Sequence, residues 1–61
     1  MKFAKFADSG GNSVFINPAL VTHVKSVNDS NCRIYFDRDQ TVVIPLQASL
    51  VCEDIEKASK S

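Results

Sequence analysis

The chemically reactive side chains in this sequence are few: one histidine, His23, and two cysteines, Cys32 and Cys52. A thiolate beside an imidazolium is an activated nucleophile, so a cysteine next to His23 would indicate a thiol enzyme. Cys32, however, alternates with Ile34 and Phe36, which predicts that it faces the interior of a sheet. A buried thiol is unreactive and packs as a small apolar side chain. The sequence therefore favours a structural role for this thiol and predicts no catalytic residue.

The same three side chains do not make a metal site in our interpretation. Structural zinc needs about four ligands, and neither C-x-x-C nor H-x-x-x-H spacing occurs in the sequence. The glycine-rich signatures of phosphate sites are also missing, and Gly10–Gly11 is expected in a turn. We therefore expect no metal and no cofactor. Both cysteines are expected to be free thiols, because disulfides are rare in a reducing compartment.

Two acidic pairs, Asp37/Asp39 and Glu53/Asp54, have side chains of the kind used in acid–base catalysis. Each pair has a simpler explanation. Aspartate is common in turns, and acidic residues stabilise the positive end of a helix. We interpret both pairs as structural.

The outward face of the last predicted hairpin is less polar than a solvated sheet face normally is. Its residues are Arg33, Tyr35, Thr41 and Val43, and Phe15 extends it in our interpretation. Tyrosine and arginine are enriched where proteins meet. We predict that this face binds a partner, in the first place the same face of a second copy of the chain.

A platform for single-stranded nucleic acid is the alternative for this face. Tyr35 and Phe15 would then stack under bases. The phosphates would contact Lys5, Lys25 and Arg33. Binders of nucleic acid usually have a basic surplus, whereas seven basic and seven acidic residues give this chain a formal net charge of zero. We therefore rank this alternative second.

Alternation of apolar residues and turn signals predict the elements that position these side chains. We expect strands at about 2–7, 14–16, 21–27, 32–37 and 41–45, and a helix at about 49–58. The fold class is then α+β, a single domain over residues 1–61. We expect a small antiparallel five-stranded meander sheet, twisted or partly closed, with one C-terminal amphipathic helix on its apolar face.

Local features refine this scheme. Of Phe3 and Phe6, which are three residues apart, one is expected to face inward. Asn17 is expected to cap a single turn that begins at Pro18. A β-bulge near Thr22–His23 is expected to restore the inward direction of the valines around it.

The predicted helix has an apolar stripe and a capping residue. Ser49 is expected to cap its first turn through the side-chain hydroxyl. The stripe consists of Leu50, Val51, Ile55 and Ala58.

The segment Phe15–Val24, the hairpin Arg33–Pro45 and the pair Ser49–Leu50 resemble the small FlbD-like proteins of bacterial flagellar operons. They are also similar to the last part of LytTR-type DNA-binding domains, in which I-N-x-x-x-V-x-x-I precedes a hairpin and a short helix. The resemblance extends from about Val14 to Ile55. It implies the same order of strands and helix.

The resemblance does not extend to binding DNA through loops. LytTR-type domains contact DNA through loops rich in lysine and arginine, whereas the turn Asn28–Asn31 has no basic residue. Arg38 in the next turn is flanked by Asp37 and Asp39. FlbD-like proteins also usually have glycine in this last hairpin turn, where the present chain has Asp39–Gln40.

The size of the chain leads to the prediction for the whole molecule. A core drawn from 61 residues supplies only a few kcal/mol by itself, and self-association is the remaining means of stabilisation. No apolar run reaches the roughly 20 residues that span a bilayer, and the start of the chain lacks the pattern of a signal peptide. We predict a cytoplasmic, non-enzymatic binding or adaptor module that works as a homodimer or higher oligomer, with no membrane partner.

Overall fold

The structure is a computed structural model that describes residues 2–60. Its strands are β1 (Ala4–Ala7), β2 (Ser13–Ile16), β3 (Val21–Asn28), β4 (Asn31–Phe36) and β5 (Thr41–Ile44). Its helical segments are the short 3₁₀ turns η1 (Pro18–Leu20) and η2 (Asp37–Asp39) and the α-helix α1 (Ala48–Lys60). The α+β class is thus as predicted, and each element ends within two residues of the predicted bounds.

The prediction of one five-stranded sheet is wrong. In the part of the chain that the structure describes, β1 pairs with β2 in one antiparallel sheet, and β3, β4 and β5 form another in that order. The break lies at η1, where Asn17 Oδ1 accepts a hydrogen bond from Ala19 N at 3.0 Å and Pro18 fixes φ in the first position. This capped turn leads the chain away from β2 instead of back along it, so β3 starts a second sheet. The cap itself is confirmed.

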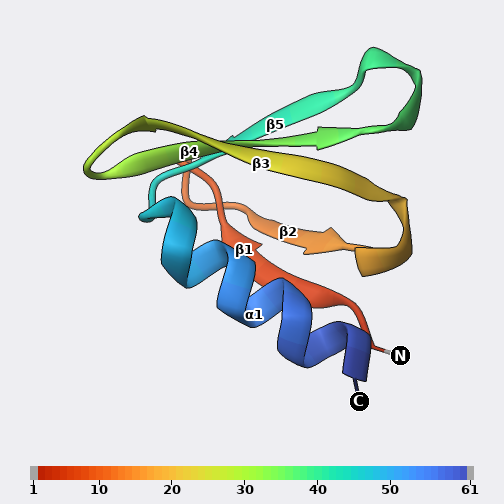
Figure 1. The fold of residues 1–61 in the computed structure, drawn as a ribbon. Coiled ribbons are helices and arrows are strands. Elements are labelled where there is room, and N and C mark those ends of the chain that lie inside the picture. The colour runs from red at the N-terminus through yellow and green to blue at the C-terminus, as the bar shows by residue number, and fades with distance from the viewer. Residues whose placement is uncertain (1, 61) are drawn as a thin grey trace.

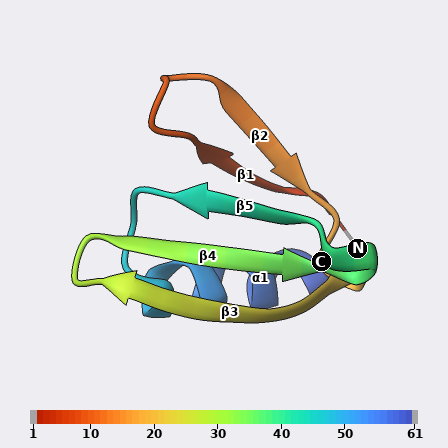
Figure 2. The ribbon, with the colours of Figure 1, turned by 90° about the horizontal axis from the view of Figure 1, so that it is seen from above.

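The elements form two layers. Figure 1 shows α1 and the β1–β2 hairpin below the three-stranded sheet. Seen from above in Figure 2, α1 runs under β3 and β4, while the hairpin lies toward the side of β5. The upper face of the three-stranded sheet points away from both.

The core lies between the three-stranded sheet, the helix and the hairpin. Alternation in β4 buries Cys32 and Ile34 completely, as expected from the sequence. In β1 the phenylalanine at position 6 is 4% exposed, whereas Phe3, just before the strand, is 63% exposed. The buried apolar residues are Ala4, Phe6, Ile16, Cys32, Ile34, Ile44, Val51 and Ala58.

A register irregularity in β3 confirms the predicted bulge. The pairing with β4 shifts between Val21 and His23, and both Val21 and Val24 are then partly buried against the core. A second shift, between Ser26 and Asn28, follows. The last valine of the strand, Val27, consequently stays 55% exposed.

Two details of the predicted helix are wrong. The helix begins at Ala48, so Ser49 lies inside the first turn instead of capping it. Leu50 is 46% exposed, while its neighbour Val51 is fully buried. One residue rotates a helix by about 100°, and therefore the face that buries Val51 and Ala58 turns Leu50 to one side.

Candidate binding surfaces

The face of the three-stranded sheet that points away from α1, called here the outer sheet face, carries two rows of side chains. Strand register fixes each row, because residues directly opposite one another point to the same side. The first row contains His23, Tyr35 and Thr41, and the second contains Lys25, Arg33 and Val43.

The structure brings four of the five predicted partner-binding residues together on this face and separates the fifth. Phe15 belongs to β2 in the other sheet, where its cross-strand neighbour is Lys5. Lys5, predicted for the nucleic-acid alternative, is thus also absent from the outer sheet face. The separation follows from the break at η1, since the prediction assumed one continuous sheet.

An aromatic stack crosses the first row. The rings of His23 and Tyr35 lie 4.1 Å apart between centroids at an interplanar angle of 13°. The Thr22 hydroxyl donates a hydrogen bond to the backbone oxygen of Tyr35 at 3.1 Å and lies 3.2 Å from His23 Nδ1. Because the two rings come from neighbouring strands, their common normal points across the sheet. The second ring face of Tyr35 is therefore turned toward β5, where the neighbour is the short side chain of Thr41.

His23 was not among the residues predicted for this face. His23 precedes Lys25 by two positions, so alternation alone would have placed both side chains on the same face of the sheet. What the sequence left open was the pairing of His23 with Tyr35, which depends on where the bulge shifts the register.

Two cations meet in the second row. Lys25 stands directly opposite Arg33, and both side chains are exposed. Within residues 2–60, neither has an ion-pair or hydrogen-bond partner through its side chain. Like charges directly opposite each other destabilise a strand pair. Together with Ser26, Val27 and Tyr35 they line a hollow of about 250 Å³.

The outward side of the β1–β2 hairpin, called here the hairpin outer face, is apolar. Phe3 and Phe15 are 63% and 61% exposed. Lys5 lies opposite Phe15 and holds its Nζ 5.9 Å from the centroid of that ring. Phe3 lies one residue before β1, outside the paired positions. If the alternation of β1 continues to it, Phe3 points to the same side as Lys5.

Cys32 does not form the Cys–His pair that a thiol enzyme needs. Cys32 is fully buried on the inner side of the sheet, whereas His23 stacks on Tyr35 on the outer side. Burial, and to a lesser degree the charge of Cys52, raises the pKa of the Cys32 thiol above its ordinary value. Both thiols are free in the structure. A buried, protonated thiol is a weak nucleophile.

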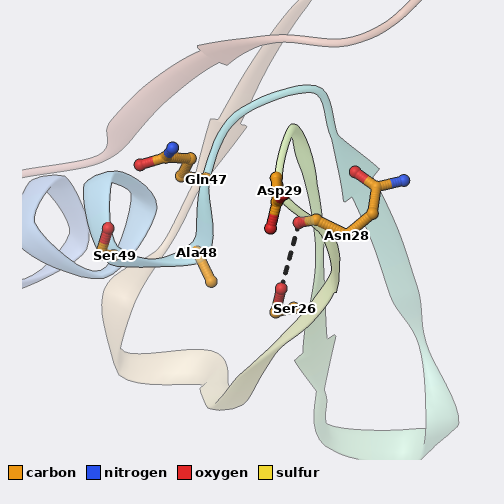
Figure 3. Close-up of a pocket in the computed structure, with 6 residues that line it drawn as sticks. All are labelled: Ser26, Asn28, Asp29, Gln47, Ala48 and Ser49. Atoms are coloured by element: carbon orange, nitrogen blue, oxygen red, sulfur yellow. Dashed lines mark hydrogen bonds between the residues drawn. The ribbon is translucent and has the colours of Figure 1, made fainter.

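A polar hollow of about 200 Å³ lies between the β3–β4 turn and the start of α1 (Figure 3). The Ser26 hydroxyl there donates to the backbone oxygen of Asn28 at 3.1 Å. The Asn28 side chain points away from Gln47 and Ser49 across the hollow. The polar groups therefore do not converge on one point. Among residues 2–60, no group of histidine, cysteine and acidic side chains is arranged to hold a metal ion.

Comparisons of the chain with protein-family models, curated proteins and solved structures found no match. The resemblance to FlbD-like proteins and LytTR-type domains stays a prediction from the residues that carry it. Over residues 2–60, no helix has the length and apolar character needed to cross a bilayer.

Proposed function

We propose that the protein is a non-enzymatic binding module that works as a homodimer, and that two copies pair through the hairpin outer face. The observation that carries the proposal is the exposure of Phe15 in β2 and of Phe3 just before β1, 61% and 63%. Its cytoplasmic location stays a prediction from the sequence.

The energetics of a small chain support this dimer. A domain of about 60 residues buries only about 60% of the surface its unfolded chain exposes. Two of the buried apolar residues here are alanines, which add little. Covering one phenylalanine side chain contributes about 1.5–3 kcal/mol, and a two-fold interface would cover Phe3 and Phe15 of both copies. A two-stranded sheet by itself is marginal in water.

A dimer interface of ordinary size would cover a modest share of the surface of the chain. A standard interface covers about 800 Å² of each partner. That is about a fifth of the 4210 Å² surface of the chain.

Self-complementarity favours the hairpin outer face over the outer sheet face. In a two-fold dimer the same patch meets itself. Apolar rings satisfy this condition, because phenylalanine packs well on phenylalanine. The outer sheet face would instead bring Lys25 and Arg33 toward the same cations of the second copy, and neither has an anionic partner among residues 2–60.

Sedimentation equilibrium tests the proposal. The unchanged chain should be mainly dimeric at tens of micromolar. The double variant Phe3→Ser, Phe15→Ser should be monomeric there, with a dissociation constant at least 10-fold higher. Val43→Ser is the matched control, because Val43 is 40% exposed but lies on the other sheet, and it should leave the dimer intact.

Circular dichroism establishes that each variant is folded. The proposal would be contradicted if the unchanged chain were folded and monomeric at 100 μM. It would also be contradicted by a dimer that Val43→Ser disrupts and the double phenylalanine variant does not.

A further inference from the structure

We propose a second binding site, for single-stranded nucleic acid, on the outer sheet face. One base stacks on the free ring face of Tyr35 above Thr41, and neighbouring phosphates contact Lys25 and Arg33. The site lies on a different sheet from the hairpin outer face, so it does not depend on the dimer.

The stacking position follows from the ring geometry. His23 covers one face of Tyr35 at 4.1 Å, nearly parallel. The opposite face looks across the sheet toward Thr41, which is exposed and has no ring to fill the space. A flat base placed there extends the existing stack from two rings to three. Stacking of this kind is tolerant of base identity, because every base has a π-face.

The charge arrangement selects an anion. Lys25 and Arg33 stand opposite each other without a side-chain partner in the described residues, an arrangement that costs stability in the free protein. A phosphate between them converts this repulsion into two attractive contacts. The hollow beside Tyr35 that they line has a volume of about 250 Å³, which is enough for a phosphate group.

The carboxylates nearest in sequence lie outside the rows. Asp29 belongs to the β3–β4 turn, and Asp37 and Asp39 belong to η2 at the other end of β4. The middle of the face is therefore cationic although the chain has no net charge. Local fields of this kind arise without a net surplus.

A single strand satisfies both features, and other polyanions satisfy only one. Duplex DNA offers phosphates but keeps its base faces stacked inside. An acidic protein offers carboxylates, but its aromatic side chains do not recur beside each charge as the bases of a strand do beside each phosphate. Neither the stack nor the ionic contacts read the sugar, so DNA and RNA strands of equal length should bind alike.

The experiment exploits the aromatic composition of the chain. Tyr35 is the only tyrosine, and tryptophan is absent from the sequence, so tyrosine emission reports on this ring alone. Titration with oligo(dT) or oligo(rU) at 50 mM salt should quench the tyrosine emission, and duplex DNA should quench it much less. In parallel, the anisotropy of a labelled oligo(dT) gives the affinity and its salt dependence. Two phosphate contacts predict a slope of log K against log salt of about −1.4.

Variants separate stacking from charge. Tyr35→Leu removes the ring but keeps an apolar side chain, and should weaken binding by about 5- to 150-fold. Tyr35→Phe should bind like the unchanged chain. Arg33→Gln should reduce the salt slope by about 0.7. The matched control is Lys60→Gln, an exposed cation on α1, which should leave both affinity and slope unchanged.

Several results would overturn the proposal. One is the absence of quenching and of an anisotropy change at 100 μM protein in low salt. Another is equal weakening by Lys60→Gln and Arg33→Gln, which would indicate diffuse charge attraction. In a third, poly-aspartate displaces oligo(dT), and Tyr35→Leu binds oligo(dT) with unchanged affinity. This result would indicate an acidic protein as the partner. Because the unchanged chain itself gives the quenching signal, a variant that does not fold leaves the test intact. Sedimentation of the same samples shows separately whether the dimer forms.

Discussion

Arg38 and Asp39, in the turn between β4 and β5, have positive φ angles of 66° and 60°. The turn brings Phe36 N to within 2.8 Å of Gln40 O, so the two strands are joined by left-handed residues. For a residue with a side chain this conformation costs roughly 1–2 kcal/mol. Glycine would adopt this conformation without that cost. Arg38 keeps this strained conformation and places a positively charged side chain in the turn.

Arg38→Gly should therefore increase the free energy of unfolding by about 0.5–1 kcal/mol, the relief of strain less the extra entropy of glycine in the unfolded chain. Urea denaturation measures the change. Gln40→Gly is the control, because Gln40 has an ordinary φ of −86° and gains only the entropic penalty. Equal destabilisation by both glycines would show that the left-handed turn stores no strain.

At the scale of elements, the amphipathic helix contributes to the core through very few residues. Val51 is fully buried and Ala58 nearly so, and Ile55 packs at the margin. The adjacent Leu50 is the larger side chain, but it is 46% exposed. The orientation of the helix on the sheet thus decides which of two adjacent apolar residues stabilises the fold.

Val51→Ala should lower the free energy of unfolding by about 2 kcal/mol, because it leaves a cavity in the core. Leu50→Ala should change it by less than about 0.5 kcal/mol, as for an ordinary surface position. Thermal or urea unfolding of the two variants, which differ by one position, provides the comparison. A larger loss for Leu50→Ala would mean that the other side of the helix faces the sheet.

Sequence patterns predicted these elements well because their signals are local. Alternation at Cys32 and Ile34, the cap at Asn17 and the bulge after Val21 each depend on a few neighbouring residues. The division into two sheets does not. It depends on the direction in which the capped turn η1 sends the chain and on the space that α1 occupies.

The same limit applies to the binding surfaces. The residue types of the outer sheet face were predicted, but the stack of His23 on Tyr35 depends on strand register across the bulge. The grouping of Phe15 with Arg33 and Tyr35 was wrong, because it assumed continuous pairing from β2 to β3.

At the scale of the whole molecule, the two sheets separate two kinds of surface. The hairpin presents apolar rings, and the three-stranded sheet presents a cationic, aromatic face. In a dimer joined through the hairpins, each copy would keep its outer sheet face free. Two sites on one assembly would bind a long strand more tightly than one site does, by raising the effective concentration at the second site.

The stability of such a dimer depends on protein concentration. A tenfold rise in concentration adds about 1.4 kcal/mol per dimer, or about 0.7 kcal/mol per chain. For a chain of 61 residues we expect the unfolding midpoint to rise by about 5–6 °C. Calorimetry at 10 and 100 μM measures the shift. The double variant Phe3→Ser, Phe15→Ser should show none, and a midpoint of the unchanged chain that stays constant would contradict obligate pairing.

The amide nitrogen of Lys2 donates a hydrogen bond to the backbone oxygen of Ala58 at 3.0 Å. The start of the described chain therefore runs beside the last turns of α1, as Figure 1 also shows. A linker of a few residues would suffice to close the backbone into a ring without moving either sheet. Ring closure restricts the denatured ensemble and not the native one, so we expect the molecule to tolerate cyclisation beside this hydrogen bond. New ends could then be opened in the Asp8–Asn12 turn.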